Sequence, residues 1–399
     1  MQDLKITFKI EKLPLYAVSQ KNGQRALEIQ ASEGALNVSI WYDYEQRPLI
    51  LTSCIGEGDM VELILLDYRI ELYINGKLMD EDWPAGNRLF CLSDELDLDI
   101  QVTEHHHTES ELPSVISSFE CAEGWYPGDG VFVGDCMPYR RNDEDHVLYL
   151  KDRHHHKSKW GMGAHQWEHI STKDFKTWQI HPMAVPITDK EEGSICTGSW
   201  IKNGDTEYLY YTIRRGNGQS ALISRSVSSD GYHFIKDKSF CFVISDKYDK
   251  ASTRDPKVFY GEDGLFHMLL TTSLSANNQG CLAHYVSRDL EEWSECDEPF
   301  YIVPNGDQPE CPDYFKYNGK YYLVYSLRGR GYYMISDKPF DGFALPQDPI
   351  IPCAGVPKCA FWNGELVFTG FKVINGYAGS MTFSRAHADN NGILVFEQM

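Results

Sequence analysis

YVSRDLEEW, residues 285–293, is one of four copies of a motif that recurs between residues 170 and 343. Each copy places a Ser near an Asp, followed by an aromatic residue about four to six positions further on. The other copies are ISTKDFKTW at 170–178, SVSSDGYHF at 226–234 and MISDKPFDGF at 334–343. An aromatic-rich strand such as LFHMLLT or YYLVYS precedes each copy. The spacing, roughly 50–60 residues, is within the range for four-stranded propeller blades.

A fifth, degenerate copy fits ELVFTGFKV, residues 365–373, and the strands after it. The repeat therefore predicts an all-β protein with a five-bladed β-propeller over residues 115–399. Two stacked sandwiches would supply a similar number of strands, but they would not explain a repeated motif.

The N-terminal part of the chain has strands of a different kind. ALNVSIWYDY and DMVELILLDY precede RIELYINGKLMDEDWP at 69–84, in which Asn75-Gly76 is a hairpin signal. We expect a β-sandwich over residues 1–110 that supports the propeller or binds sugar. The polar stretch TEHHHTESELPS, residues 103–114, is typical of a linker.

The composition indicates an acidic globular chain. Its 399 residues include 58 Asp and Glu against 37 Lys and Arg, a formal net charge of −21. This charge repels nucleic acid and anionic membranes, so we expect neither as a partner. The 11 cysteines are scattered and never spaced CxxC, which favours reduced thiols in a cytoplasmic protein over cysteine-bound zinc. The oligomeric state cannot be predicted from these features.

Three carboxylates stand near the starts of the predicted innermost strands. Asp255 lies in RDPKVF, Glu310 in PECPDYF and Asp135 in VFVGDCMPY. Because innermost strands line the central channel of a propeller, these side chains are predicted to face one pocket. Acidic groups gathered in this way raise one another's pKa, which suits a division into proton donor and nucleophile. The alternative is that each caps a strand or binds backbone amides.

Four motifs, in the same order, resemble those of glycoside hydrolase family 32, the β-fructosidases such as invertases, levanases and sucrose-6-phosphate hydrolases. RDPKVF is similar to the family's Arg-Asp-Pro motif, and ECPDYF is similar to its Glu-Cys motif. HVLYL and the later KWGMGAHQWEHISTKDFKTWQIHPMAVPI resemble a first-blade stretch that usually reads HLFYQ…WG…HWGHAVSKDLVHWEHLPVAL. CTGSW, residues 196–200, resembles FSGSA, and the resemblance covers about residues 125–390.

The resemblance implies a retaining glycoside hydrolase that needs no metal or organic cofactor. Asp135 would attack the anomeric carbon, Glu310 would serve as acid/base, and Asp255 would stabilise the transition state. Arg254 would hold Asp255 in its ionised form, since a nearby cation favours the charge. The implied partner is a carbohydrate substrate, either an oligosaccharide or a sugar phosphate.

Further side chains are predicted to contact the sugar. Thr197 and Ser199 lie in the CTGSW motif, and Trp160 and Trp167 are candidates for stacking on a sugar ring. A tryptophan of a propeller blade also commonly belongs to the core, and this alternative stays open for both.

The sequence departs from the family pattern at the nucleophile. The family's NDPNG is GDCMP here, residues 134–138, and the Gln that ends HLFYQ is Leu150. In the family these positions grip the fructosyl ring, so the resemblance favours retained chemistry on a changed substrate. The family's sandwich usually follows the propeller, whereas the sandwich-like segment precedes it here.

A basic segment follows the strand that ends at Leu150. KDRHHHKSKWG, residues 151–161, gathers Lys and Arg with three His in an acidic chain. Arg153 and His155 are predicted to contact a charged or strongly polar part of the substrate, such as a phosphate. The alternative is a solvated loop whose basic residues pair with neighbouring acids such as Asp152.

Two competing functions remain open at this point. One is an inverting furanosidase of the arabinanase type, in which the acid and base are about 6.5–9.5 Å apart rather than the 5–5.5 Å of a retaining pair. The other is a sugar-binding propeller that has lost catalysis, for which the altered NDPNG motif is the best argument.

Overall fold

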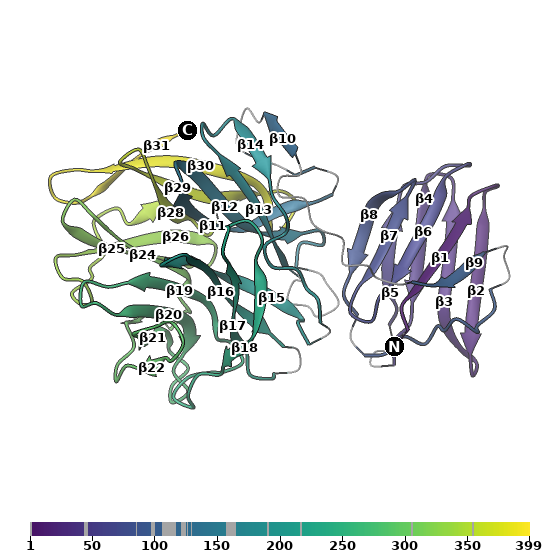
Figure 1. Ribbon diagram of the computed structural model, residues 1–399, viewed down its shortest axis with the longest axis horizontal. Helices are drawn as coiled ribbons and strands as arrows, with labels where there is room; N and C mark the ends of the chain where they lie inside the picture. Colours follow the sequence, from purple (N-terminus) through teal and green to yellow (C-terminus); the bar gives the residue numbers. More distant parts are fainter. Residues whose placement is uncertain are drawn as a thin grey trace. The chain divides into compact units, whose positions relative to one another are not determined.

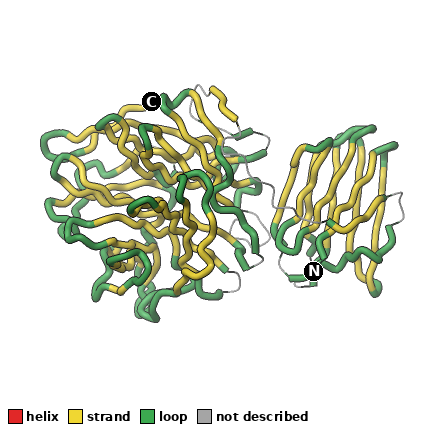
Figure 2. Tube along the Cα trace, in the orientation of Figure 1, coloured by secondary structure: helices red, strands yellow, loops and turns green. Residues whose placement is uncertain are grey.

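The computed structural model describes residues 2–43, 47–84, 86–96, 100–105, 117–120, 125, 127–128, 130–156, 165–189, 191–215, 218–304, 306–352 and 355–399. These residues form strands, turns and loops (Figure 2). Within them no helix is long and apolar enough to cross a membrane. The prediction of an all-β protein is confirmed.

The chain divides into two compact units. The N-terminal unit comprises Met1–Glu111 together with Arg153–Ala164 and Ile187–Gly193. The propeller unit comprises Leu112–Asp152, His165–Pro186 and Ser194–Met399. The predicted boundaries, 1–110 and 115–399, fall at residues 106–116, which lie outside the described residues, so they stay a prediction.

The N-terminal unit is a β-sandwich of two antiparallel sheets (Figure 1). One sheet has the order β8-β7-β6-β1-β9 and the other the order β2-β3-β4-β5. The strands are β1 (Leu4–Lys9), β2 (Leu15–Lys21), β3 (Gln24–Ser32), β4 (Ala35–Ile40), β5 (Leu49–Ser53), β6 (Met60–Leu65), β7 (Ile70–Ile74), β8 (Lys77–Asp82) and β9 (Gln101–Glu104). Alternate residues such as Ile6, Val38 and Leu63 fill one core between the sheets. Asn75 and Gly76, with φ of 51° and 78°, form the predicted turn between β7 and β8.

The propeller unit is built of five blades, which follow one another along the chain (Figure 1). The first blade consists of β11 (Phe132–Arg141), β12 (Glu144–Asp152), β13 (Gln166–Thr172) and β14 (Thr177–Ile180), with β10 (Ser117–Glu120) paired to β14. The second consists of β15 (Ser194–Asn203), β16 (Thr206–Arg214), β17 (Leu222–Ser228) and β18 (Ile235–Phe242). The third consists of β19 (Arg254–Tyr260), β20 (Phe266–Ser273), β21 (Gly280–Ser287) and β22 (Ser294–Glu295), with β23 (Tyr301–Ile302) paired to β21.

The last two blades complete the ring. The fourth consists of β24 (Glu310–Tyr317), β25 (Lys320–Leu327), β26 (Arg330–Ser336) and β27 (Ile350–Ile351), and the fifth of β28 (Lys358–Trp362), β29 (Glu365–Val373), β30 (Gly379–Ala388) and β31 (Leu394–Gln398). Each innermost strand contacts those of its two neighbours, in the cyclic order β11, β15, β19, β24 and β28. Backbone pairing of Val133 with Gly379 joins the first blade to the fifth. The predicted five-bladed propeller is confirmed.

The repeated Ser/Asp motif is a turn between the third and fourth strands of a blade. In the third blade the Ser287 hydroxyl accepts the Leu290 N–H at 2.9 Å, and Asp289 Oδ1 accepts the Glu292 N–H at 3.1 Å. Leu290 has a φ of 70°. The same pair of acceptors is built from Thr172 and Asp174 in the first blade and from Ser228 and Asp230 in the second. Ser and Asp recur because their oxygens bond the backbone amides of a tight turn.

Candidate active site

The innermost strands of the first four blades are each interrupted near their starts. The pairing registers shift at 133–136 in β11, 195–198 in β15, 254–257 in β19 and 310–313 in β24. A bulge of this kind turns a side chain away from the regular alternation of a strand. The bulges carry Asp135, Thr197, Asp255 and Cys311, and Glu310 immediately precedes the last of these. Because innermost strands run in the same direction around a propeller, these side chains gather at one end of the channel.

Two of the bulges hold a non-glycine residue in the left-handed region of backbone conformation. Asp255 has a φ of 58° and Cys311 a φ of 51°. This conformation costs on the order of 1–3 kcal/mol for such residues and is concentrated at functional sites. The two strained residues are bonded to each other, because the Cys311 N–H donates to Asp255 Oδ2 at 3.0 Å.

Asp135 is the most heavily hydrogen-bonded of the three carboxylates. Its Oδ2 accepts the Thr197 hydroxyl at 2.5 Å and the Cys311 thiol at 3.3 Å. Its Oδ1 accepts the Tyr377 hydroxyl at 3.0 Å. The residue is 9% exposed. Three donors directed at one carboxylate suit the ionised form, which can only accept hydrogen bonds.

Asp255 is the most buried of the three, with an exposure of only 2%. Burial raises the pKa of Asp255 above its ordinary value, Arg254 opposes that change, and the charge of Asp135 adds to it. Arg254 Nε lies 3.5 Å from Asp255 Oδ2. Arg254 thus lies beside this carboxylate, and its role in holding Asp255 in the ionised form stays a prediction.

Glu310 is the most accessible of the three, with 40% of its side chain exposed. Arg254 Nη2 donates to Glu310 Oε1 at 2.9 Å, and Arg254 Nη1 donates to Gln308 Oε1 at 2.6 Å. Loss of hydration raises the pKa of Glu310, Arg254 opposes the change, and Asp255 and Asp135 add to it. A carboxyl group with a raised pKa, open to an incoming ligand, suits a proton donor.

Two residues that were not among the predicted site residues contact the bulges. One is the buried Lys358 of β28, whose Nζ donates to the carbonyl oxygens of Gly198 at 3.0 Å and Pro312 at 3.1 Å. These bonds connect the second blade to the fourth. Burial lowers the pKa of Lys358. Tyr377, in the loop between β29 and β30, is the second, and its hydroxyl also accepts the Asp135 N–H at 3.2 Å.

Gly134 explains how Tyr377 reaches Asp135. A Cβ atom at position 134 would lie 2.5 Å from the Tyr377 hydroxyl and 3.1 Å from Leu150 Cβ. The first of these distances is too short for any side chain. Gly134 and Leu150 are also two of the departures from the family motifs. A glycine before Asp135 was therefore a signal that another side chain approaches, although nothing in the sequence identified it as Tyr377.

The remaining predicted residues lie in different surroundings. Ser199 accepts the Val258 N–H and donates to the Pro256 carbonyl, both at 2.8 Å, so it braces the third blade. Trp167 is fully buried and donates to the Cys196 carbonyl at 3.1 Å. Stacking on a sugar would therefore require its ring to move.

The basic segment begins in β12 of the propeller unit with Lys151 and Asp152, and from Arg153 onward it belongs to the N-terminal unit. Arg153 Nε donates to Glu81 Oε1 at 3.0 Å. His155 is partly exposed, in a turn with a φ of 51°. Substrate contact by Arg153 and His155 stays a prediction, and Trp160 lies outside the described residues.

Comparisons with known proteins agree with this arrangement. The family domain described as "Glycosyl hydrolases family 32 N-terminal domain" matches residues 138–341, which are 204 of the 399 residues. The match includes Asp255 and Glu310 and begins three residues after Asp135.

Relatives and solved structures extend the comparison. The chain is 25% identical to sucrose-6-phosphate hydrolase of Vibrio alginolyticus over 50% of this chain and 42% of that protein. It is 27% identical to a probable sucrose-6-phosphate hydrolase of Psychromonas ingrahamii over 64% of this chain and 53% of that protein. It thus spans about half the length of these relatives. The structure of fructan 1-exohydrolase IIa from Cichorium intybus has a similar fold, with a TM-score of 0.58, 17% identity and coverage of 69% of this chain and 60% of that chain.

Proposed function

The chain belongs to glycosyl hydrolase family 32, and from this premise we propose that it hydrolyses a fructofuranoside-type or related furanoside bond by retaining double displacement. The relatives named above are sucrose-6-phosphate hydrolases, so an oligosaccharide or a sugar phosphate is the proposed substrate class. The proposed catalytic residues are Asp135, Asp255 and Glu310.

One observation carries the proposal, namely that Cys311 and Arg254 connect the three carboxylates in a single group. Cys311 donates its thiol to Asp135 and its backbone N–H to Asp255. Arg254 is an ion-pair partner of both Asp255 and Glu310. Residues that merely cap strands would each be bonded within their own blade. Here the Arg254–Asp255 contact lies within the third blade, but both bonds of Cys311 and the Arg254–Glu310 pair run between blades.

The environments of the carboxylates suggest their roles. Asp135, held by three donors, is the proposed nucleophile, because an oriented and ionised oxygen is what the attack on the anomeric carbon needs. Glu310, with its raised pKa, would protonate the leaving oxygen and then activate water. Asp255 would stabilise the positive charge that develops on the sugar ring, and Thr197 would act through Asp135 by orienting it.

The departures from the family bear on which furanoside is accepted. The surroundings of Asp135 include the backbone of Gly134, the alkyl side chain of Leu150 and the phenol of Tyr377. The polar residues that the family has at positions 134 and 150 would hydrogen-bond a sugar ring. The side chains of Gly134 and Leu150 cannot do so. We therefore propose a furanoside whose recognition differs from that of sucrose on this side of the ring, and we include arabinofuranosides among the candidates.

The proposal is tested with the purified full chain and a panel of fructosides, phosphorylated fructosides and arabinofuranosides, with products followed by NMR that resolves the anomers. We expect hydrolysis of at least one furanoside with retention in the first-formed product. Inversion would instead favour the arabinanase type of reaction, and binding without turnover would favour a sugar-binding propeller.

Variants test the residues on the best substrate. Glu310→Gln is expected to reduce kcat by roughly 10²–10⁴-fold, and Asp255→Asn is expected to abolish turnover, with both variants folded. Glu397→Gln, an exposed acid in the outermost strand of the fifth blade, is the control. Near-normal turnover in either variant would show that the substituted residue is not catalytic.

A further inference from the structure

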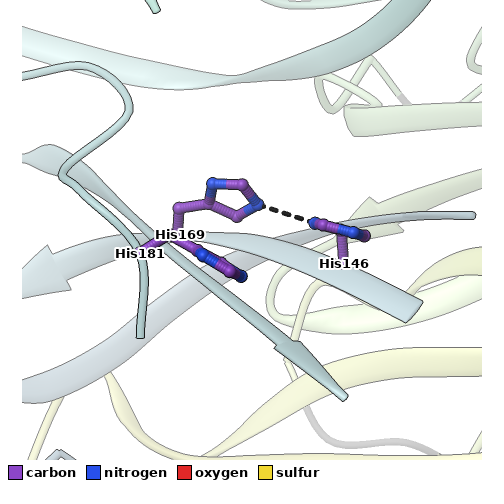
Figure 3. A group of neighbouring side chains, drawn as sticks. All are labelled: His146, His169 and His181. Atoms are coloured by element: carbon purple, nitrogen blue, oxygen red, sulfur yellow. Dashed lines mark hydrogen bonds between the residues drawn. The ribbon is translucent and has the colours of Figure 1, made fainter. Parts of the chain in front are cut away.

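A buried cluster of three histidines in the first blade has no part in the proposed reaction. His146 lies in β12, His169 in β13, and His181 directly follows β14 (Figure 3). Their exposures are 0%, 0% and 1%. The three therefore come from successive strands of one sheet and meet in the interior of the blade. Buried polar rings in this number need an explanation, because most buried polar groups in proteins have a specific partner.

The ring nitrogens converge. One nitrogen from each of the three rings lies within 4.8 Å of the other two. His146 Nδ1 and His169 Nε2 face each other at 2.9 Å, along the dashed line of Figure 3. A tetrahedral zinc ion with bonds of about 2.0–2.1 Å holds its nitrogen ligands about 3.4 Å apart. Binding of an ion therefore requires His146 Nδ1 and His169 Nε2 to move slightly apart, and any nitrogens at the wider separations, up to 4.8 Å, to move closer together.

Hydrogen bonds within the protein do not satisfy the cluster. His146 Nε2 and His169 Nδ1 are buried and have no hydrogen-bond partner among the described residues. The Tyr139 hydroxyl and His146 Nδ1 both approach the same atom, His169 Nε2, at 3.1 Å and 2.9 Å. That nitrogen has a single lone pair or a single proton, so both contacts cannot be ideal hydrogen bonds in any one tautomer.

The cation nearest the cluster is already paired with a carboxylate. The nearby Arg141 is neutralised by Glu207, whose Oε1 lies 2.8 Å from its Nε.

The surroundings supply what a buried metal centre needs. Glu144 Oε2 lies 3.9 Å from His146 Nε2 and accepts the Ser171 hydroxyl at 3.0 Å, and Ser171 is in turn 2.8 Å from His181 Nε2. A carboxylate beside a ligating histidine fixes its tautomer and offsets the charge of the ion. The rings of Tyr139 and Tyr232 lie against the cluster, at 5.1 Å from His146 and 5.0 Å from His181.

We propose that His146, His169 and His181 bind one divalent transition-metal ion of the zinc type, as a structural centre of the first blade. Three imidazoles with a nearby carboxylate suit Zn²⁺ and its neighbours in the periodic table better than Mg²⁺ or Ca²⁺, which take oxygen ligands. The burial of the cluster means that the ion enters as the blade folds. This site goes beyond the proposed hydrolysis and departs from the expectation, from the sequence, that no metal is required.

The experiment uses the full chain carrying a removable tag without histidine. The protein is unfolded, stripped with a chelator and refolded with or without Zn²⁺, and bound zinc is measured after gel filtration. We expect about one zinc per chain, as for a structural site, and a lower melting temperature for the zinc-free protein. His181→Asn and His146→Asn should each weaken zinc binding at least tenfold.

His284→Asn is the matched control. His284 is also half of a histidine pair, with its Nε2 2.8 Å from Nδ1 of the buried His267, but it is only partly buried and lies in the third blade. This variant should bind zinc as the unaltered chain does. Because the cluster variants could fold poorly, zinc X-ray absorption on the unaltered chain gives a second readout, and it should report nitrogen neighbours at about 2.0–2.1 Å without sulfur. Less than a tenth of a zinc per chain at micromolar free Zn²⁺, binding that survives in the cluster variants, or sulfur ligation would each overturn the proposal.

Discussion

The Tyr377 hydroxyl donates to Asp135 Oδ1 at 3.0 Å and accepts the N–H of the same residue at 3.2 Å, although the two residues are 242 positions apart. The contact joins the fifth blade to the proposed nucleophile of the first. Burial and the neighbouring charge of Asp135 raise the pKa of Tyr377 well above its ordinary value, so the phenol keeps its proton and remains a donor.

Tyr377→Phe tests whether this phenol positions Asp135. The variant keeps the ring, which packs at 5.3 Å from Phe371, and removes only the hydroxyl. Hydrogen bonds to charged groups contribute about 1.5–3 kcal/mol, so kcat should fall roughly ten- to a hundredfold on the best substrate while KM changes less.

The control for this variant is Tyr260→Phe, at an exposed tyrosine of the third blade. Its activity should equal that of the unaltered chain. An unchanged kcat in Tyr377→Phe would show that the contact has no catalytic role.

Gly134→Ala tests the close approach that makes this contact possible. The new Cβ would lie 2.5 Å from the Tyr377 hydroxyl oxygen and 3.0 Å from its Cζ. The substitution should therefore displace Tyr377, lower kcat and destabilise the protein by about 1–3 kcal/mol. In the Tyr377→Phe background the closest clashing atom is absent, so the same substitution should cost less.

A double-mutant cycle measures that difference from unfolding by denaturant and from kcat. Residues in contact typically show coupling of about 0.5–3 kcal/mol. Additive effects, with Gly134→Ala equally damaging in both backgrounds, would mean that the strain arises at another neighbour such as Leu150, whose Cβ would be 3.1 Å away.

The fold could be predicted because its signals are local. The Ser287 and Asp289 oxygens accept backbone amides two or three positions away in sequence, so a few adjacent residues determine the turn between the third and fourth strands of a blade. The same holds for the Asn75-Gly76 hairpin. Counting such turns predicts the number of blades, and the propeller then brings Asp135, Asp255 and Glu310 to equivalent places.

The contacts that shape the site could not be predicted because they are distant in sequence. Lys358 reaches the Gly198 carbonyl across 160 positions, and it is a lysine that a sequence pattern would assign to the surface. Ser199 looked like a sugar ligand but bonds the backbone of the third blade. The histidine cluster was hidden for a similar reason, since His146, His169 and His181 are unevenly spaced and meet only when the strands pair.

Arg254 sets the pH range in which Glu310 can act as an acid. It pairs with Glu310 at 2.9 Å and opposes the rise in the pKa of that carboxyl group. Glu310 must be protonated to donate, so activity falls as pH rises through its pKa. Arg254→Met should remove the opposing charge and move the basic limb of kcat/KM to higher pH, with a lower maximum. Arg254→Lys keeps the charge and should leave the limb close to its original position. A basic limb that does not move in Arg254→Met would mean that another group sets it.

Asp145 makes the stability of the first blade depend on pH. The residue is fully buried, and neither carboxylate oxygen has a hydrogen-bond partner among the described residues. Burial raises the pKa of Asp145 to about 8, against an ordinary value of 3.8, and Arg140, opposite it in the β11–β12 pair, reduces the rise.

Between these two values the folded chain keeps a proton that the unfolded chain has lost, so stability should fall as pH rises, by at most about 1.4 kcal/mol per pH unit. Asp145→Asn has nearly the same shape and no charge to bury. Its free energy of unfolding should match that of the unaltered chain near the lower end of this range and exceed it increasingly toward the upper end. Denaturant unfolding at several pH values measures the difference in the free energy of unfolding between the variant and the unaltered chain. The other titrating groups are the same in both proteins, so their contributions cancel in this difference. If the advantage of Asp145→Asn is the same at every pH, the carboxyl group does not titrate in this range, and a contact outside the described residues must stabilise its charge.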